Sequence, residues 1–214
     1  MTEQQIKTML FDLDGTVLDT NELIIQSFIH ALAGIVEPGF GAEHIIPSMG
    51  LPLVDQLRLF SGREDVADLL SKYREFNLRV HDEYVQAFPH VNEVLKTLHD
   101  RGIQMGVVTT KMRLTSERGL NFVGIRAYMS SIVSIDDVKH AKPHPEPVLR
   151  ALEELGADPA ATIMVGDSAV DMESAVAAGV IPVGVAWSLK GEQKLIASGA
   201  KHIIHDMRDL LKFV

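Results

Sequence analysis

The sequence of 214 residues contains no cysteine, and only 6% of its residues are aromatic. The absence of cysteine excludes disulfides, thiol catalysis and cysteine-ligated metal sites. No apolar run approaches the roughly 20 residues that a membrane-spanning helix needs. Residues 1–5 also lack the basic and apolar segments of a signal peptide. We therefore expect a cytoplasmic protein without a membrane partner.

Positive charge is scarce as well, because 20 Lys and Arg residues stand against 29 Asp and Glu residues, for a net charge of −9. This balance disfavours nucleic-acid and anionic-membrane binding, although it is compatible with a locally basic pocket. Apolar residues make up 46% of the chain, so a sizeable core can be buried. The length suits one large domain, or a core with a smaller companion.

The most informative stretch lies near the N-terminus, where an apolar run at residues 8–11 is followed by the letters DLDGT. In a strand, residues i and i+2 share a face, so Asp12 and Asp14 are expected to point the same way. Two carboxylates that close require a cation or a shared proton. Gly15 and Thr16 suit a loop that approaches an anion. A solvated turn accounts for this motif equally well when the motif is taken alone.

The remaining chain predicts two regions of different texture. Residues 19–84 carry helical apolar spacing without a convincing strand, and Asp19 with Glu22 resembles a capping pair for the first helix. From residue 85 onward, short β-rich runs alternate with helical patterns. This alternation predicts an α/β fold with a doubly wound parallel sheet. Residues 1–18 and 85–214 then form the core, and residues 19–84 form an inserted all-helical cap domain.

Further polar residues follow the later β-rich runs. Thr109 comes after the second run, Lys142 after the third and Asp167 after the fourth, with Asp171 four residues further on. In open parallel sheets, ligands bind beyond the carboxyl ends of the strands. Carboxylates gathered there favour a hard divalent cation, most simply Mg²⁺. The lysine and the hydroxyl provide the positive charge and the neutral donor that a phosphoryl group needs.

The motifs DLDGT, VVTTK, AKPHPEP and MVGDSAVD occur in an order that resembles the haloacid dehalogenase (HAD) superfamily of phosphohydrolases. The match covers essentially the whole core, and the helical insert is similar to that family's C1-type cap. Within the superfamily, the chain resembles phosphoglycolate-phosphatase-like members. It is most similar to the bacterial inorganic pyrophosphatases associated with dephosphorylation of the carrier protein HPr. Residues 20–25, 135–138, 142–147 and 187–191 carry this finer match.

The resemblance implies a role for each motif residue. Asp12 is expected to be the nucleophile that forms an aspartyl-phosphate, and Asp14 is expected to move the protons. The implied Mg²⁺ ligands are the carboxylates of Asp12 and Asp167, the backbone carbonyl of Asp14, and Asp171 directly or through water. Thr109 and Lys142 are expected to contact the phosphoryl group and the nucleophile. The residues expected to bind substrate are Gly15, Thr16, Thr110 and Lys111.

The expected activity is Mg²⁺-dependent hydrolysis of pyrophosphate, with phosphoglycolate or another small phosphomonoester as the alternative substrate. A sugar phosphomutase of the same fold stays open. A 2-haloacid dehalogenase is disfavoured, because Asp14 and the metal carboxylates have no purpose in halide displacement. A phospho-receiver module is disfavoured by the chain length and by the helical insert, and a catalytically silent binding protein by the filled motif positions.

Several positions have a structural alternative. Ser168 and Asp171 form an S-x-x-D capping box, so Asp171 could close a helix instead of binding metal. Lys142 could be a solvated loop residue. His140 and His144 are interpreted as solvated loop residues rather than zinc ligands. The chain departs from the family pattern at two places: His144 stands where Asp is usual, and residues 168–170 replace an Asn-His-His run. The second change falls beside the expected metal site and bears on the substrate rather than on the chemistry. Candidates for specificity in the cap are residues 50–52, Arg58, Arg63, Arg74 and Arg79.

Overall fold

The computed structural model describes residues 5–214. The expectation that no signal peptide is present was based on residues 1–5. Of these, residues 1–4 lie outside the described residues. Within the described part of the chain, no helix has the length and apolar character needed to cross a membrane.

The centre of the molecule is a six-stranded sheet in the order β5-β4-β1-β6-β7-β8, with every neighbouring pair parallel. β1 lies between β4 and β6, so the chain order reverses beside it, and this is where open parallel sheets place their ligands. The predicted doubly wound sheet is confirmed. The strands span β1 (Thr8–Phe11), β4 (Gln104–Val108), β5 (Ser131–Val133), β6 (Thr162–Gly166), β7 (Ile181–Val185) and β8 (His202–Ile204).

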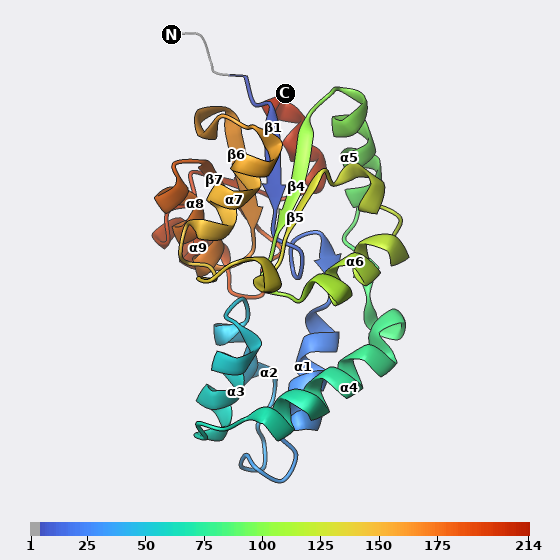
Figure 1. Ribbon diagram of the computed structural model, residues 1–214, viewed down its shortest axis with the longest axis vertical. Helices are drawn as coiled ribbons and strands as arrows, with labels where there is room; N and C mark the ends of the chain where they lie inside the picture. The colour runs from blue at the N-terminus through green and yellow to red at the C-terminus, as the bar shows by residue number, and fades with distance from the viewer. Residues whose placement is uncertain (1–4) are drawn as a thin grey trace.

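Helices cover both faces of this sheet (Figure 1). α5 (Val91–Asp100) and the C-terminal 3₁₀ helix (Met207–Phe213) supply apolar residues to the core on one face. α7 (Glu146–Leu155) and α8 (Ala169–Ala178) do so on the other. The α-helices α6 (Arg113–Phe122) and α9 (Glu192–Ala197) also belong to this part of the chain.

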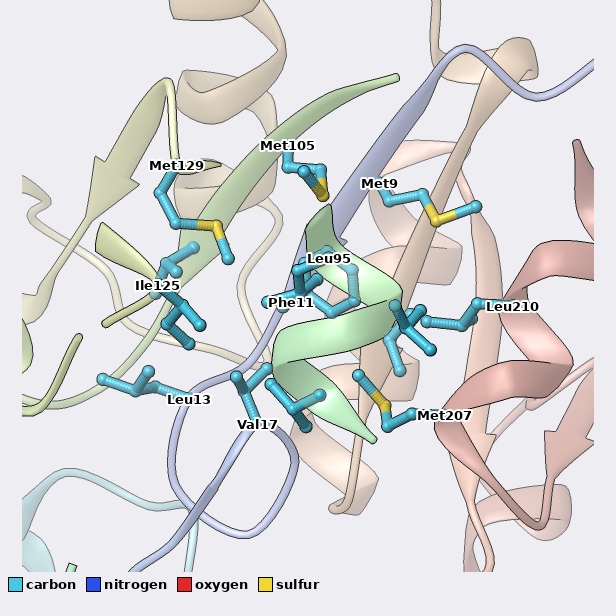
Figure 2. Packing of buried hydrophobic residues seen from close by; sticks show 14 of the residues in the cluster. Met9, Phe11, Leu13, Val17, Leu95, Met105, Ile125, Met129, Met207 and Leu210 are labelled. Carbon is cyan, nitrogen blue, oxygen red and sulfur yellow. The ribbon is translucent and has the colours of Figure 1, made fainter. Parts of the chain in front are cut away.

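The alternation of side chains along β1 links the two halves of this core. Met9 and Phe11 belong to the cluster under α5, whereas Leu10 between them belongs to the cluster under α7 and α8. Figure 2 shows Phe11 packed beside Leu95 of α5. All three β1 side chains are fully buried, and each contributes about 2 kcal/mol through removal of apolar surface from water. Burial on both faces explains why β1 reads as a continuous apolar run.

The cap lies beyond the carboxyl ends of the strands (Figure 1) and has its own apolar core. Phe28 is fully buried at its centre, with its ring 5.2 Å from that of Phe60 and 4.8 Å from that of Tyr73. The cap helices are α1 (Asn21–Ala31), α2 (Ala42–Ile45), α3 (Leu53–Ser61) and α4 (Ala67–Tyr84).

The chain leaves and re-enters the core through one short antiparallel ribbon, in which β2 (Leu18–Asp19) pairs with β3 (Gln86–Ala87). Asp19 is therefore the end of a strand, although the sequence indicates no strand from residue 19 onward. The expected capping pair of Asp19 and Glu22 is also wrong. Thr20 is the N-cap of α1, and the Asp19 carboxylate accepts the Asn21 N–H at 3.3 Å. The domain boundaries themselves stay a prediction.

A second connection ties the cap to the core close to this ribbon. Arg118 of α6 donates from Nε and Nη2 to the two carboxylate oxygens of Asp82 in α4, at 3.1 and 3.0 Å. Its Nη1 also donates to the carbonyl oxygen of Leu78 at 2.9 Å. A bidentate pair of this kind fixes orientation as well as distance.

We predict that Phe28→Ala lowers the free energy of unfolding by about 3–5 kcal/mol, because it leaves a cavity where three aromatic rings meet. Ile29→Ala is the matched control on the same helix. Its side chain is 36% exposed, so we expect a loss below about 1 kcal/mol. Urea unfolding of both variants measures the difference, and equal losses would contradict a packed cap core.

Candidate active site

Lys142 lies at the base of the site and is only 2% exposed. Its ammonium donates to Asp12 Oδ1 at 2.7 Å, to Asp171 Oδ1 at 2.6 Å and to the carbonyl oxygen of Val108 at 2.8 Å. These three bonds use all three donor hydrogens of the ammonium group. Lys142 is therefore not a solvated loop lysine. It joins residues that are 130 and 29 positions away in the sequence.

Asp171 also caps α8. Its Oδ2 accepts the backbone N–H of Ser168 at 3.0 Å and the Ser168 hydroxyl at 2.5 Å. The capping box seen in the sequence is therefore present, while the other carboxylate oxygen contacts Lys142. Gly166 is required for this placement, because a β-carbon there would lie 2.4 Å from the β-carbon of Asp171.

Asp167 has a partner that the sequence does not reveal. Lys190 Nζ lies 2.5 Å from Asp167 Oδ2, and the two side chains are 4% and 6% exposed. The Ser188 hydroxyl donates to the backbone carbonyl oxygen of Asp167 at 2.6 Å, and the backbone N–H of Lys190 donates to the Ser188 oxygen at 3.1 Å. The loop after β7 is thus held against Asp167. The only feature of the sequence that could have indicated Lys190 is its position after a strand.

Asp14 extends from the same loop as Asp12 but remains partly accessible. Its Oδ1 accepts the hydroxyl of Thr20 at 2.7 Å and the ammonium of Lys111 at 2.8 Å. The backbone N–H of Lys111 in turn donates to the Thr109 hydroxyl oxygen at 3.2 Å. Asp14, Thr109 and Lys111, expected together from the sequence, are therefore brought together at one edge of the sheet.

The electrostatic state of the buried carboxylates follows from this packing. Burial raises the pKa of Asp12 to about 8. The ammonium of Lys142 lowers this pKa, whereas the negative charges of Asp171 and Asp167 raise it further. Burial likewise raises the pKa of Asp167, with Lys190 opposing the shift. Burial alone would lower the pKa of Lys142, but Asp12 and Asp171 outweigh it and the net shift is upward. The carboxylates of Asp12, Asp167 and Asp171 thus face only the ammonium groups of Lys142 and Lys190, so negative charge is in excess when all three are ionised.

A cavity of about 240 Å³ lies between the sheet edge and the cap. Its size is below the usual range for drug-sized ligands, which indicates a small substrate. Of the four cap arginines singled out in the sequence, Arg74 lines this cavity. The core contributes the wall residues Asp12, Asp14, Thr109, Thr110, Lys111, Met112, Leu114, Thr115, Ile135, Asp167 and Lys190. The cap contributes the wall residues Ile24, Met49, Gly50, Leu51, Pro52, Leu53, Val54, Gln56, Tyr73, Arg74, Asn77 and Leu78.

Thr110 connects the two walls. Its hydroxyl donates to the carbonyl oxygen of Gly50 in the cap at 3.1 Å. Gly15 and Thr16 lie outside the lining that the described residues form, and their substrate-binding role stays a prediction. Gly15 has φ +81°, and a β-carbon there would lie 2.8 Å from Asp167 Oδ2. The Thr16 hydroxyl is buried without a hydrogen-bond partner among residues 5–214.

Two groups of side chains have the spacing of metal ligands. Asp12, Asp167 and Asp171 offer carboxylate oxygens within 4.8 Å of one another, and all three are buried. The second group, His140, His144 and Glu146, lies at the surface. There His144 Nδ1 accepts the Glu146 N–H at 3.1 Å, which places the proton of a neutral imidazole on Nε2. This arrangement favours the interpretation of His144 as a loop residue.

Comparison with known proteins places the chain in a family. A model of haloacid dehalogenase-like hydrolases matches residues 9–185. The chain belongs to this family. The predicted fold and family are thereby confirmed, as is the broader prediction of a hydrolase that acts on phosphate esters or anhydrides.

Individual relatives match this chain over nearly its full length. The chain is 45% identical to pyrophosphatase PpaX of Bacillus velezensis over 213 residues, which is 99% of this chain and 97% of the relative. It is also 45% identical to pyrophosphatase PpaX of Oceanobacillus iheyensis, over 98% of this chain and 97% of the relative. The crystal structure of a hydrolase from Pseudomonas syringae has a TM-score of 0.86 at 25% identity, with 97% of this chain and 96% of that chain covered.

The raised pKa of Asp12 predicts that the free energy of unfolding of the metal-free protein falls as pH rises from about 4 to about 8. Over this range the folded protein keeps a proton on Asp12 that the unfolded chain has released. Rising pH therefore favours unfolding, with a limiting slope of about 1.4 kcal/mol per pH unit.

The comparison that isolates this effect is urea unfolding in EDTA of the wild type and of Asp12→Asn, which removes the titrating group and keeps its shape. The wild type should lose more stability than the variant between about pH 5 and pH 8. Identical slopes would show that Asp12 is ionised throughout.

Proposed function

We propose that this protein is a Mg²⁺-dependent hydrolase of pyrophosphate that works through an aspartyl-phosphate on Asp12. The observation that carries the chemistry is the buried group of Asp12, Asp167 and Asp171, two of which pair with Lys142, beside a small cavity that Asp12 and Asp167 line. The substrate is supported by the 45% identity to relatives named as pyrophosphatases over nearly the whole chain.

The residues present fit Mg²⁺. Asp12 and Asp167 offer only oxygen ligands, which hard divalent cations prefer, and burial with like charges raises the pKa of both carboxyls. We propose that Asp12, Asp167 and the Asp14 carbonyl hold the ion, with Asp171 as an outer partner because its oxygens already contact Ser168 and Lys142. When bound, the ion supplies positive charge that holds the carboxylates together and polarises the phosphoryl group.

Asp12 is the proposed nucleophile. A carboxylate oxygen of Asp12 attacks phosphorus, and the bond from phosphorus to the leaving oxygen breaks. Lys142, at 2.7 Å, holds Asp12 in place and offsets negative charge on the nucleophile. The hydroxyl of Thr109 lies at the end of the neighbouring strand β4 and provides a neutral donor for the phosphoryl oxygens.

Asp14 is the proposed proton carrier. Both of its hydrogen bonds, from Thr20 and Lys111, fall on Oδ1, so Oδ2 receives none from the described residues and can carry the proton. Asp14 gives this proton to the leaving oxygen and then takes one from the water that hydrolyses the aspartyl-phosphate. The cap walls of the cavity limit the entry of other water during these steps.

A small phosphomonoester such as phosphoglycolate is the alternative substrate. A protein from Haemophilus somnus, whose crystal structure is that of a predicted phosphoglycolate phosphatase, superposes with a TM-score of 0.84 at 25% identity. The cytoplasmic location and the lack of nucleic-acid and membrane partners stay predictions that rest on composition.

We predict that, with Mg²⁺, kcat/KM is highest for pyrophosphate in a screen that also contains phosphoglycolate, sugar phosphates and nucleoside monophosphates. EDTA should abolish phosphate release from all of them. A preference of tenfold or more for phosphoglycolate would overturn the assignment of substrate while leaving the phosphatase chemistry intact.

We further predict that Asp14→Asn lowers kcat by about 10²–10⁴, the usual contribution of general acid–base catalysis. Asp12→Asn should abolish turnover, and mass spectrometry of acid-quenched wild-type enzyme should find one added phosphoryl group on the peptide containing Asp12. Turnover retained by Asp12→Asn would exclude this residue as the nucleophile. Circular dichroism of both variants controls for folding.

A further inference from the structure

Three cationic side chains line the cavity: Lys111 and Lys190 from the core and Arg74 from the cap. The transferred phosphoryl group already has two proposed partners that line the cavity, Asp12 as the nucleophile and Thr109 as a neutral donor. Lys111 and Lys190 are each paired with one carboxylate, of Asp14 and Asp167, whereas Arg74 has no acidic partner within residues 5–214. An unpaired guanidinium in a cavity of about 240 Å³ indicates a second anionic group beside the transferred phosphoryl group.

Arg74 differs from the other cap arginines. Arg63 pairs with Asp68 at 2.9 Å, Arg58 donates to the Glu64 carbonyl oxygen at 3.1 Å, and Arg79 lies over its neighbouring phenylalanine ring. Arg74 forms no ion pair or hydrogen bond with any residue in the described part of the chain, although its helix position places it in the cavity wall. Its five donors are available to a ligand, and their planar fork matches phosphate oxygens.

Lys190 approaches the cavity from the opposite side. Its side chain is 4% exposed, and its ammonium is directed at Asp167 by a loop that the Ser188 hydroxyl fastens to the Asp167 carbonyl oxygen. A metal ion held by Asp167 would compete with this ion pair. The ammonium, still confined to the cavity by its loop, would then face the substrate.

The position of Lys111 identifies which part of the substrate these cations meet. Lys111 Nζ lies 2.8 Å from Asp14 Oδ1, and Asp14 is the group proposed to protonate the leaving oxygen. The leaving group therefore departs next to Lys111, within the same cavity that Arg74 and Lys190 line.

We propose that Arg74 and Lys190 form, with Lys111, a binding site for an anionic leaving group, so that the enzyme selects substrates with a second phosphoryl group. This inference rests on the proposed pyrophosphatase function. As the phosphorus–oxygen bond breaks, the bridging oxygen leaves with its electron pair and receives the proton of Asp14, and the departing phosphate is held by the three cations. A neutral leaving group leaves the Arg74 guanidinium without a partner, which is costly in a desolvated cavity.

The test compares wild type, Arg74→Gln and Lys190→Met on pyrophosphate and on p-nitrophenyl phosphate, whose leaving group has no second phosphoryl. Each variant should lower the ratio of kcat/KM for pyrophosphate to that for p-nitrophenyl phosphate by about ten- to a hundredfold, the usual value of hydrogen bonds to charged groups. Arg74→Lys, which keeps the charge, should recover part of the ratio. Arg79→Gln is the matched control on α4 and should leave the ratio unchanged.

Calorimetry with imidodiphosphate, which is not hydrolysed, gives a readout independent of turnover. With Mg²⁺ present, both variants should bind it at least tenfold more weakly than wild type. With Mg²⁺ alone, Lys190→Met should bind the ion more tightly, because the competing ammonium is gone. A variant ratio equal to that of wild type, together with unchanged imidodiphosphate affinity, would overturn the anion site. A wild type that cleaves p-nitrophenyl phosphate but not pyrophosphate would instead overturn the proposed function.

Discussion

The accumulation of negative charge at one buried edge of the sheet is the constraint on which the site depends. Asp12, Asp14, Asp167 and Asp171 gather there, and each contacts a lysine ammonium. Lys142 satisfies two of them at once, which brings the loop after β5 under the end of β1. The loops after β4 and β7 carry Lys111 and Lys190 to the same place. Charge compensation thus determines the course of three loops that the apolar core leaves free.

Much of this arrangement can be predicted from the chain, because parallel strands bring their carboxyl ends to one edge. The order of Asp12, Thr109, Lys142 and Asp167 after successive apolar runs was sufficient to predict that these residues lie at one edge of the sheet. Lys190 could not be found in this way, because its partner lies in another loop and a single lysine after a strand has no distinctive pattern. The sequence did not distinguish Arg74 from the other three arginines of the cap. Only the structure shows that those three contact other residues of the cap.

The dual contacts of Asp171 show why sequence patterns left two alternatives open. A carboxylate has two oxygens, and here one closes the first turn of α8 while the other accepts from Lys142. The capping box and the contact with Lys142 thus use the same carboxylate. The geometry of the first turn of α8 therefore orients the Asp171 side chain toward Lys142, which lies outside the helix.

The β2–β3 ribbon has a mechanical consequence. The two linkers between core and cap lie side by side in this ribbon. The covalent connections of the cap to the core are therefore confined to one side of the cap. The bidentate Arg118–Asp82 pair reinforces the attached side, whereas on the other side the Thr110 hydroxyl donates to the Gly50 carbonyl oxygen, and Gly50 lies close to Ser168. Breaking that hydrogen bond costs about 1 kcal/mol. A rotation about the ribbon is the cap movement that would leave the packing inside each unit unchanged.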